Sequence, residues 1–148
     1  KNDQSVTPGF LLAALLWPTL ISRCTKNKEI NIKKFFRSMD GVLREQQKLT
    51  AVPRKFNSYI KDIWVLQLKL HSRIKSQPYK TIRHPRFRAA YDFLLVREQA
   101  SSDKNGLGKW WTDFQKNDDS LRGSLIARMN EKSDVDSSKI FGFYNELR

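Results

Sequence analysis

The stretch PRKFNSYIKDIWVLQLKLHSRI, residues 53–74, decides the fold of this chain. Its apolar and amide residues recur three, four and seven positions apart, which is the spacing of one face of an α-helix. These residues are Phe56, Ile60, Ile63, Trp64, Gln67, Leu70 and Ile74. The opposite face carries Lys55, Lys61, Lys69, Arg73 and Lys75. We predict that Pro53 opens the third and longest helix of the chain, with one face in a core and the other in solvent.

The segment before this helix predicts a first helix that follows Thr7-Pro8-Gly9. Thr7 can cap it, and Pro8 suits its first turn. Residues 10–16 are apolar on several sides, so we expect this helix to be deeply buried. The apolar run from Phe10 to Ile21 is only about half as long as a helix that crosses a bilayer. Its length therefore favours a buried helix over a signal peptide or a membrane span.

Three further segments have helical spacing, and strand-like alternation is scarce. A basic stretch from Arg23 to Arg37 leads into a second helix with apolar residues from Phe35 to Leu43. A short linker with Pro78 follows the third helix, and a fourth starts at His84-Pro85. A fifth helix at 109–116 should bury at least two of its three aromatic residues, which are Trp110, Trp111 and Phe114.

Beyond Lys116 the apolar pattern weakens. Ser120 is placed to cap a short helix through Leu121, Leu125 and Met129, and a later aromatic cluster is placed to dock back or to meet a partner. That cluster is Phe141, Phe143 and Tyr144. We therefore expect an all-α fold, an irregular bundle of about five to six helices with a less regular C-terminal tail. Residues 1–117 would form the helical domain, and residues 118–148 a tail or peripheral appendage.

The composition of the chain limits the classes of partner that it could bind. The 148 residues carry a net charge of +13 with an isoelectric point near 10.1, which favours nucleic acid or an anionic membrane as partner. The single cysteine, Cys24, cannot form an internal disulfide, which suits a reducing cytosol and predicts a cytoplasmic protein. The first residue is Lys1 rather than Met, so we expect the chain to be part of a longer protein.

The charge lies in two blocks. Residues 54–88 hold ten basic residues against one acid, Asp62, and residues 23–37 hold six against Glu29. A run of charge is often only a solvated face, but surfaces selected for solubility normally mix both signs. A one-signed block suits the phosphates of RNA, and Tyr79 beside it is the best candidate to stack on a base, whereas Phe87 is better explained as core. The predicted RNA-binding residues are Arg54, Lys55, Lys61, Lys69, Arg73, Lys75, Tyr79, Lys80, Arg83, Arg86 and Arg88.

Arg83, Arg86 and Arg88 surround the expected start of the fourth helix, where the helix dipole also favours an anion. We expect them to contact phosphates. Asp92, one turn further on, is better explained as the partner of a nearby arginine than as a group that acts on substrate.

No catalytic residue, metal ligand or cofactor site is predicted in this chain. Two histidines and one cysteine are too few for an ordinary structural zinc site, and His84, directly before Pro85, is better explained by capping or packing. The chain has no phosphate-cradling glycine loop and no dinucleotide fingerprint. The pair Asp134 and Asp136 has the spacing of a Mg²⁺-binding carboxylate pair, but it lies among serines in the polar tail.

Four segments in order resemble a known family. They are PGF and AALLWP at 8–18, DIWVLQL at 62–68, HPRFRAAYDFLL at 84–95 and KWWTDFQ at 109–115. Together they resemble the C-terminal region of the bacterial poly(A) polymerase I family, class II nucleotidyltransferases related to the tRNA CCA-adding enzymes. The most specific part is the run at 84–95 with the downstream tryptophan pair. The near-neutral residues 118–148 depart from the very basic extension in which close relatives often finish.

The resemblance implies a role in RNA polyadenylation. A head domain with the paired aspartates would lie before Lys1 and use ATP and Mg²⁺ to add adenylates to RNA 3′ ends. This chain would supply helical body segments that hold single-stranded RNA. Its partners would be that RNA, the catalytic domain and, further, RNA-decay or RNA-chaperone proteins.

Three other interpretations stay open at this point. The chain could be the body of a CCA-adding enzyme, although those relatives generally lack the distal motifs. It could be a protein-interaction module that docks the polymerase to RNA-decay partners. A membrane-surface helix is the weakest alternative, because the apolar face of residues 56–74 carries as many large apolar residues as a helix in a protein core. No stable membrane insertion is expected.

Overall fold

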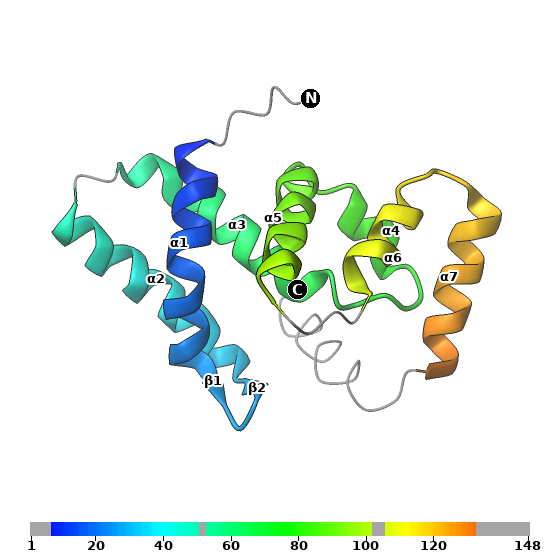
Figure 1. The fold of residues 1–148 in the computed structure, drawn as a ribbon, viewed down its shortest axis with the longest axis horizontal. Helices are drawn as coiled ribbons and strands as arrows, with labels where there is room; N and C mark the ends of the chain where they lie inside the picture. Colours follow the sequence, from blue (N-terminus) through cyan, green and yellow to red (C-terminus); the bar gives the residue numbers. More distant parts are fainter. Residues whose placement is uncertain (1–6, 51–52, 102–105, 133–148) are drawn as a thin grey trace. The chain divides into compact units, whose positions relative to one another are not determined.

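The computed structural model describes residues 7–50, 53–101 and 106–132. The chain forms two compact units, an N-terminal unit of residues 1–64 and a C-terminal unit of residues 65–148. Within the described ranges there are seven α-helices, a 3₁₀ turn and a two-stranded hairpin (Figure 1). The prediction of an all-α bundle is therefore confirmed. The proposed separation of residues 118–148 from the rest stays a prediction, and the tail residues Asp134, Asp136, Phe141, Phe143 and Tyr144 lie outside the described residues.

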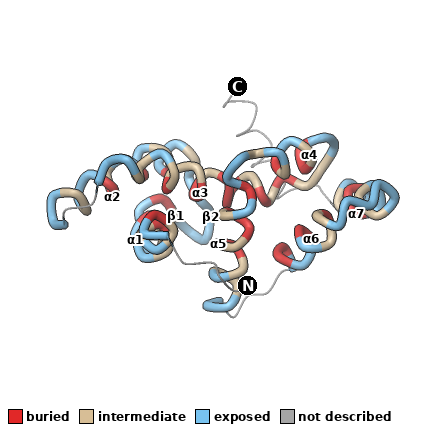
Figure 2. Tube along the Cα trace, turned by 90° about the horizontal axis from the view of Figure 1, so that it is seen from above, coloured by how far each residue is buried: buried red, intermediate tan, exposed pale blue. Residues whose placement is uncertain are grey.

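The N-terminal unit is built on two long helices that pack on each other. Its elements are α1 (Pro8–Cys24), β1 (Thr25–Lys26), β2 (Glu29–Ile30), α2 (Ile32–Leu49), the 3₁₀ turn η1 (Arg54–Phe56) and the first part of α3 (Asn57–Lys69). Figure 2 shows α2 buried on one side and exposed on the other. The buried side consists of Phe35, Met39, Val42 and Leu43, which follow the predicted helical spacing.

Helix α1 is less buried than its composition predicts. Thr7 caps it as expected, accepting a hydrogen bond of 3.1 Å from the Phe10 N–H. However, Leu11 and Leu15 are 51% and 65% exposed. The residues that face the core include the small ones, Gly9 and Ala13. The reason is close approach of the neighbouring rings, since a Cβ on Gly9 would lie 2.8 Å from the Tyr59 ring.

A hairpin that the sequence analysis missed joins α1 to α2. Thr25 pairs with Ile30 and Lys26 with Glu29, in an antiparallel ladder. The two turn residues, Asn27 and Lys28, have φ values of 53° and 67°. Two successive positive φ values are the signature of the type I′ turn, whose twist matches that of paired strands. The predicted basic stretch is therefore the end of α1, this turn and the start of α2.

Residues 53–74 do not form the longest helix, and that prediction is wrong. The segment starts as η1, becomes α3 at Asn57 and ends at Lys69, so α3 is shorter than α1 and α2. The last turn tightens, because the N–H groups of His71 and Ser72 bond to carbonyls three residues back. The predicted buried face is confirmed from Ile60 to Leu70.

The C-terminal unit holds an aromatic core. Its helices are α4 (Gln77–Ile82), α5 (Phe87–Ala100), α6 (Leu107–Phe114) and α7 (Asp119–Lys132). Helix α4 lies where a linker was predicted, because Pro78 occupies the first turn, where its missing N–H costs nothing. The core consists of Leu70, Phe87, Tyr91, Leu94, Leu107, Trp110, Trp111, Phe114, Leu125 and Ile126. All three aromatic residues of the predicted fifth helix are thus buried, and so is Phe87.

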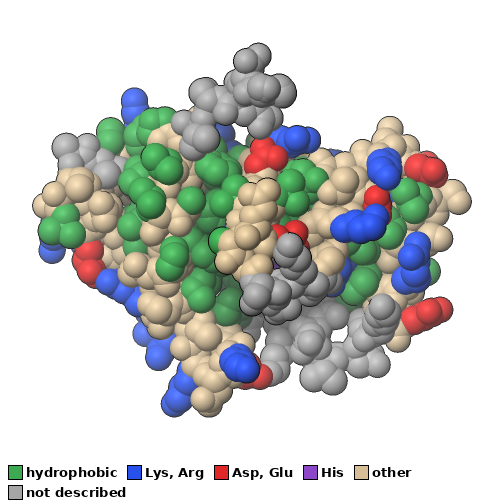
Figure 3. Space-filling model, in the orientation of Figure 1, with side chains coloured by type: hydrophobic (Ala, Val, Ile, Leu, Met, Phe, Trp, Pro, Cys, Tyr) green, Lys and Arg blue, Asp and Glu red, His purple; other side chains and the backbone are tan. Residues whose placement is uncertain are grey.

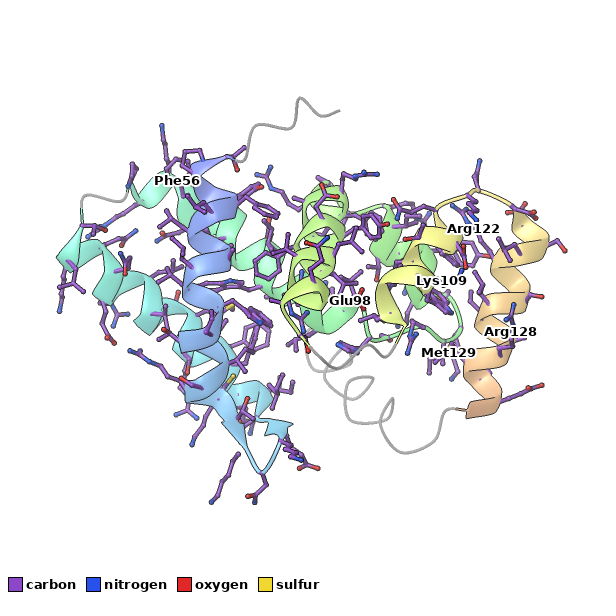
Figure 4. The ribbon with its side chains drawn as sticks, viewed as in Figure 1. Phe56, Glu98, Lys109, Arg122, Arg128 and Met129 are labelled. Atoms are coloured by element: carbon purple, nitrogen blue, oxygen red, sulfur yellow. The ribbon has the colours of Figure 1, made fainter. Side chains whose placement is uncertain are left out.

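Two side-chain hydrogen bonds cap the N-terminal ends of α6 and α7. Glu98, near the end of α5 (Figure 4), accepts a hydrogen bond of 3.0 Å from the Gly108 N–H in the first turn of α6. A Cβ at Gly108 would meet the ends of the Glu98 and Leu95 side chains, so both would have to shift to admit any other residue. Helix α7 is capped by Asp118, not by Ser120 as predicted, through a bond of 3.1 Å from the Leu121 N–H.

Candidate nucleic-acid interface

The corner between α4 and α5 concentrates basic side chains. From residue 75 to residue 88 the chain has five basic residues and no acid. All five are exposed, and they are Lys75, Lys80, Arg83, Arg86 and Arg88. Lys75 precedes α4, Lys80 lies on α4, Arg83 and Arg86 lie between the two helices, and Arg88 lies in the first turn of α5, so we call this segment the α4–α5 corner. That corner has a one-signed charge.

The turn into α5 is shaped by local hydrogen bonds. The Arg86 N–H donates to His84 Nδ1 over 2.9 Å, so His84 has the capping role that its place before Pro85 predicts. Arg83 Nε donates to the Tyr79 carbonyl over 3.0 Å, which holds this side chain against the end of α4. The Arg86 side chain itself makes no capping hydrogen bond to α5. The positive end of its dipole is therefore open to an anion.

Arg88 extends this corner along α5. Its Nε lies 3.5 Å from the Asp92 carboxylate one turn on, which confirms the predicted role of Asp92 as an arginine partner. The guanidinium also lies over the Tyr91 ring, 5.4 Å from its centroid. The ion pair is solvent-exposed and weak, so it leaves Arg88 available to a phosphate.

Tyr79 lies in the packing of the C-terminal unit. Its ring meets Phe114 edge-on with centroids 5.3 Å apart, and Arg122 lies 5.9 Å from it. The ring is partly buried against the aromatic core. Its predicted part in base stacking stays a prediction.

Two arginines flank a stack of two rings in the same unit. Trp110 and Phe114 are stacked with centroids 5.0 Å apart and an angle of 10°. Arg73 lies over Trp110 at 5.6 Å, and Arg122 over Phe114 at 4.8 Å. Arg122, at the start of α7 (Figure 4), also donates from Nε to the Phe114 carbonyl over 2.7 Å. No sequence signal pointed to Arg122, because its surroundings have no net charge and no motif.

The remaining predicted residues differ in exposure. Arg73 and Lys69 are half-buried, and burial lowers the pKa of Arg73 from its usual value. Arg54 and Lys55 are exposed on η1 in the N-terminal unit. Lys61, in the same unit, forms an ion pair with Asp40 of α2, so its charge is compensated. The predicted residues therefore fall into two groups, one in each unit.

His71 lies among positive charges at the end of α3. It is half-buried, and burial, together with Arg97 and Arg73, lowers the pKa of His71 from 6.5 to about 4. Arg97 donates to Gln67 over 2.9 Å, and Gln67 donates to the Ala90 carbonyl over 3.1 Å. His71 is therefore neutral at pH 7 in the folded chain.

We expect the free energy of unfolding to fall as the pH drops from 6.5 to 4. In this window unfolded His71 takes up a proton that the folded state excludes, so acid favours unfolding. The depressed pKa corresponds to about 3 kcal/mol at most. Urea unfolding at a series of pH values would measure this slope for the wild type and for His71→Gln. Carboxylates contribute equally to both proteins, so equal slopes would contradict the prediction.

Two other features, a metal-binding group and a membrane span, are not found among the described residues. They contain no group of three or more His, Cys, Asp or Glu side chains placed to hold a metal ion. No helix in the described ranges has the length and hydropathy needed to cross a membrane. Cys24, the one cysteine of the sequence, is buried, and burial raises the pKa of its thiol.

Comparison with known proteins identifies the family. The model of the family described as polymerase A arginine-rich C-terminus matches residues 27–139. Poly(A) polymerase I of Escherichia coli O6:H1 is 32% identical over 137 residues, which cover 88% of this chain and 30% of that protein. Poly(A) polymerase I of Salmonella typhi is 33% identical over 121 residues, 78% of this chain and 26% of that protein. Poly(A) polymerase I of Haemophilus influenzae is 33% identical over 126 residues, 82% of this chain and 28% of that protein.

The chain spans less than a third of the length of these relatives. The family match nevertheless extends over most of the chain, from the hairpin to beyond α7. It includes the run at 84–95 and the tryptophan pair that carry the resemblance. The chain belongs to the polymerase A arginine-rich C-terminus family, the C-terminal region of bacterial poly(A) polymerases.

Proposed function

We propose that this chain is the RNA-holding part of a poly(A) polymerase. One observation carries the proposal: in a member of this family, five exposed basic residues and no acid occupy residues 75–88. The corner that they form also includes the start of α5, where the Arg86 side chain makes no capping bond. Basic side chains and a helix N-terminus are the groups that bind phosphates.

Such a corner suits an enzyme that must hold its own growing product. Each added adenylate changes the sequence near the 3′ end. The protein must therefore bind the RNA through its backbone and accept any base. Contacts to phosphates have this property, because they position the RNA without reading its sequence. Arg83, Arg86 and Arg88 would contact successive phosphates, and Lys75 and Lys80 would add attraction at longer range.

The chemistry itself belongs elsewhere in the longer protein under this proposal. The described residues bring together no carboxylate set for Mg²⁺, so we assign neither ATP nor Mg²⁺ a site on this chain. The catalytic domain would use both to extend the RNA that this chain holds. A cytoplasmic location follows as part of the same proposal.

The comparisons favour a polyadenylating parent over a CCA-adding one, since the relatives named above are poly(A) polymerases. Docking to RNA-decay or RNA-chaperone proteins stays a prediction of the resemblance.

The salt dependence of binding tests the proposal. The 148-residue chain should bind a labelled oligo(A), and the logarithm of its affinity should fall with the logarithm of salt concentration with a slope of about −3 if four or five phosphates are neutralised. Fluorescence anisotropy at a series of KCl concentrations measures this slope. No binding at low salt, or binding that salt leaves unchanged, would refute an RNA-holding role.

A further inference from the structure

Helix α2 carries a second basic surface on the N-terminal unit. Lys33, Arg37, Arg44 and Lys48 are all exposed. Their spacing of four, seven and four residues puts them on one side of the helix, opposite the buried Phe35, Met39 and Val42. From Lys33 to Lys48 this row, the α2 stripe, is about 22 Å long at 1.5 Å per residue. Figure 3 shows Lys and Arg side chains along the edge that α2 and the hairpin form.

The acids of α2 are neutralised by other helices, which the net charge of the segment does not reveal. Asp40 forms an ion pair with Lys61 of α3. Glu45 accepts two hydrogen bonds of 2.8 Å from Arg23 of α1, and this pairing lowers the pKa of Glu45. The Arg23 guanidinium lies 3.6 Å from the position of a Cβ on Gly41, so this glycine leaves space beside it. Both acids are thereby compensated, and the positive charge of the stripe remains.

The four cations of the stripe form no ion pair among the residues that the structure describes, although Arg44 and Lys48 also attract Glu45 at longer range. The hairpin adds Lys26 and Lys28 beyond the N-terminal end of α2, both exposed. Such a row costs free energy through self-repulsion unless a polyanion neutralises it. Its length corresponds to several phosphates of a nucleic-acid strand.

The chemistry of the stripe indicates which form of RNA fits it. Proteins that hold single strands combine cations with exposed aromatic rings on which bases stack. The aromatic rings of α2, Phe35 and Phe36, pack edge-on against each other at 5.9 Å. Phe35 is buried opposite the stripe, and Phe36 is half-buried, so neither ring is fully exposed for a base to stack on. Double-stranded RNA hides its bases and is recognised through its backbone and shape. A lipid surface fits less well, because membrane-binding helices place a row of apolar residues beside their cations, whereas the one large apolar residue that α2 fully exposes is Leu49 at its C-terminal end.

We propose that the α2 stripe binds the backbone of base-paired RNA, as a contact separate from the α4–α5 corner. The inference rests on the proposed RNA-holding function and extends it: one surface holds the single-stranded end, and the stripe holds a stem of the same transcript. Lys33, Arg37, Arg44 and Lys48 contact phosphates and read no sequence.

Two variants with equal change of charge test this. In the stripe variant the four α2 cations become glutamine, as Lys33→Gln, Arg37→Gln, Arg44→Gln and Lys48→Gln. In the control variant four cations of the C-terminal unit outside the α4–α5 corner become glutamine, as Lys109→Gln, Lys116→Gln, Arg128→Gln and Lys132→Gln. Each 148-residue protein is titrated against an RNA hairpin without tails and against oligo(A) with the same number of phosphates. Circular dichroism checks that both variants keep their helix content.

The stripe variant should bind the hairpin more than roughly tenfold more weakly than the control does, with a log–log salt slope smaller by about 3. Its affinity for oligo(A) should equal that of the control. Equal hairpin affinities for the two variants would overturn the inference while oligo(A) binding by the wild type upholds the proposed function. A matching loss on oligo(A) would overturn the assignment to base-paired RNA. Each protein is also tested with phosphatidylserine vesicles. If the stripe variant loses vesicle binding but keeps its affinity for the RNA hairpin, the stripe binds lipid instead. A wild type that binds neither RNA would refute both proposals.

Discussion

Replacing Trp111 with alanine is expected to lower the free energy of unfolding of the C-terminal unit by about 4 kcal/mol. The side chain is fully buried at the centre of the aromatic core. Its ring lies 5.5 Å from the rings of both Phe87 and Phe114, and 4.9 Å from that of Trp110. Because a domain of this size is stable by only about 5–15 kcal/mol, the loss would remove a large part of the total.

A second contribution comes from the indole N–H of Trp111. It donates to the Leu70 carbonyl over 2.8 Å, just beyond the end of α3. This carbonyl lies among the last C=O groups of a helix, which lack partners within the helix. Removal of the donor leaves a buried acceptor, at a cost of about 1–3 kcal/mol.

Phenylalanine at the two neighbouring tryptophans separates the hydrogen bond from the ring. Trp110 is also buried, but its Nε1 has no hydrogen-bond partner in the part of the chain that the structure describes. Trp110→Phe therefore removes only volume, whereas Trp111→Phe removes volume and the bond to Leu70. Urea unfolding followed by near-ultraviolet circular dichroism should show that Trp111→Phe costs about 2 kcal/mol more than Trp110→Phe. Equal costs would mean that the bond to Leu70 contributes nothing.

The bond to Leu70 also shows where periodicity stops being informative. The spacing from Ile60 to Leu70 correctly predicted one buried face, because burial of that face is a local property of the helix. The same spacing continues to Ile74, yet α3 ends at Lys69. Just beyond that end, the Leu70 carbonyl accepts a hydrogen bond from Trp111, a residue 41 positions away in the sequence. No local pattern contains that contact.

Helix α1 shows a different failure. An all-round apolar sequence predicted deep burial, but burial needs neighbours, and those of α1 in the N-terminal unit lie on the side of Gly9 and Ala13. Tyr59 approaches Gly9, and the Trp64 indole donates to the Ala13 carbonyl over 3.1 Å. Small residues let partners come close, whereas Leu11 and Leu15 remain exposed. Hydrophobicity alone therefore overestimated how much of α1 is buried.

The candidate interface was predictable as a charge block but not as a surface. The corner from Lys75 to Arg88 is contiguous in sequence, so counting charges found it. Counting charges along the sequence does not reveal ion pairs between helices. Lys61 lies in the basic block but pairs with Asp40. Residues 38–53 have no net charge, yet they contribute Arg44 and Lys48 to the α2 stripe. Which charges remain exposed to a ligand depends on the packing of α1, α2 and α3.

Removing the three arginines at the start of α5 should have the largest effect on binding to oligo(A). In the variant Arg83→Gln, Arg86→Gln and Arg88→Gln, three phosphate contacts are lost, so we expect the log–log salt slope to become shallower by about 2 and the affinity to fall roughly tenfold or more. Glutamine keeps a polar side chain of similar length, and Arg86 caps α5 through its backbone only. The fold should therefore persist, as circular dichroism can check.

A matched variant distinguishes a local site from net charge. Lys109→Gln, Lys116→Gln and Arg128→Gln remove the same charge from exposed positions in the same unit. If the arginines contact phosphates, only their variant should lose oligo(A), because long-range attraction depends on total charge while contacts depend on position. Equal losses would reduce the corner to a diffuse electrostatic attraction. A loss on tRNA with oligo(A) binding unchanged would instead favour the body of a CCA-adding enzyme, since the corner would then serve a folded RNA rather than a single-stranded end.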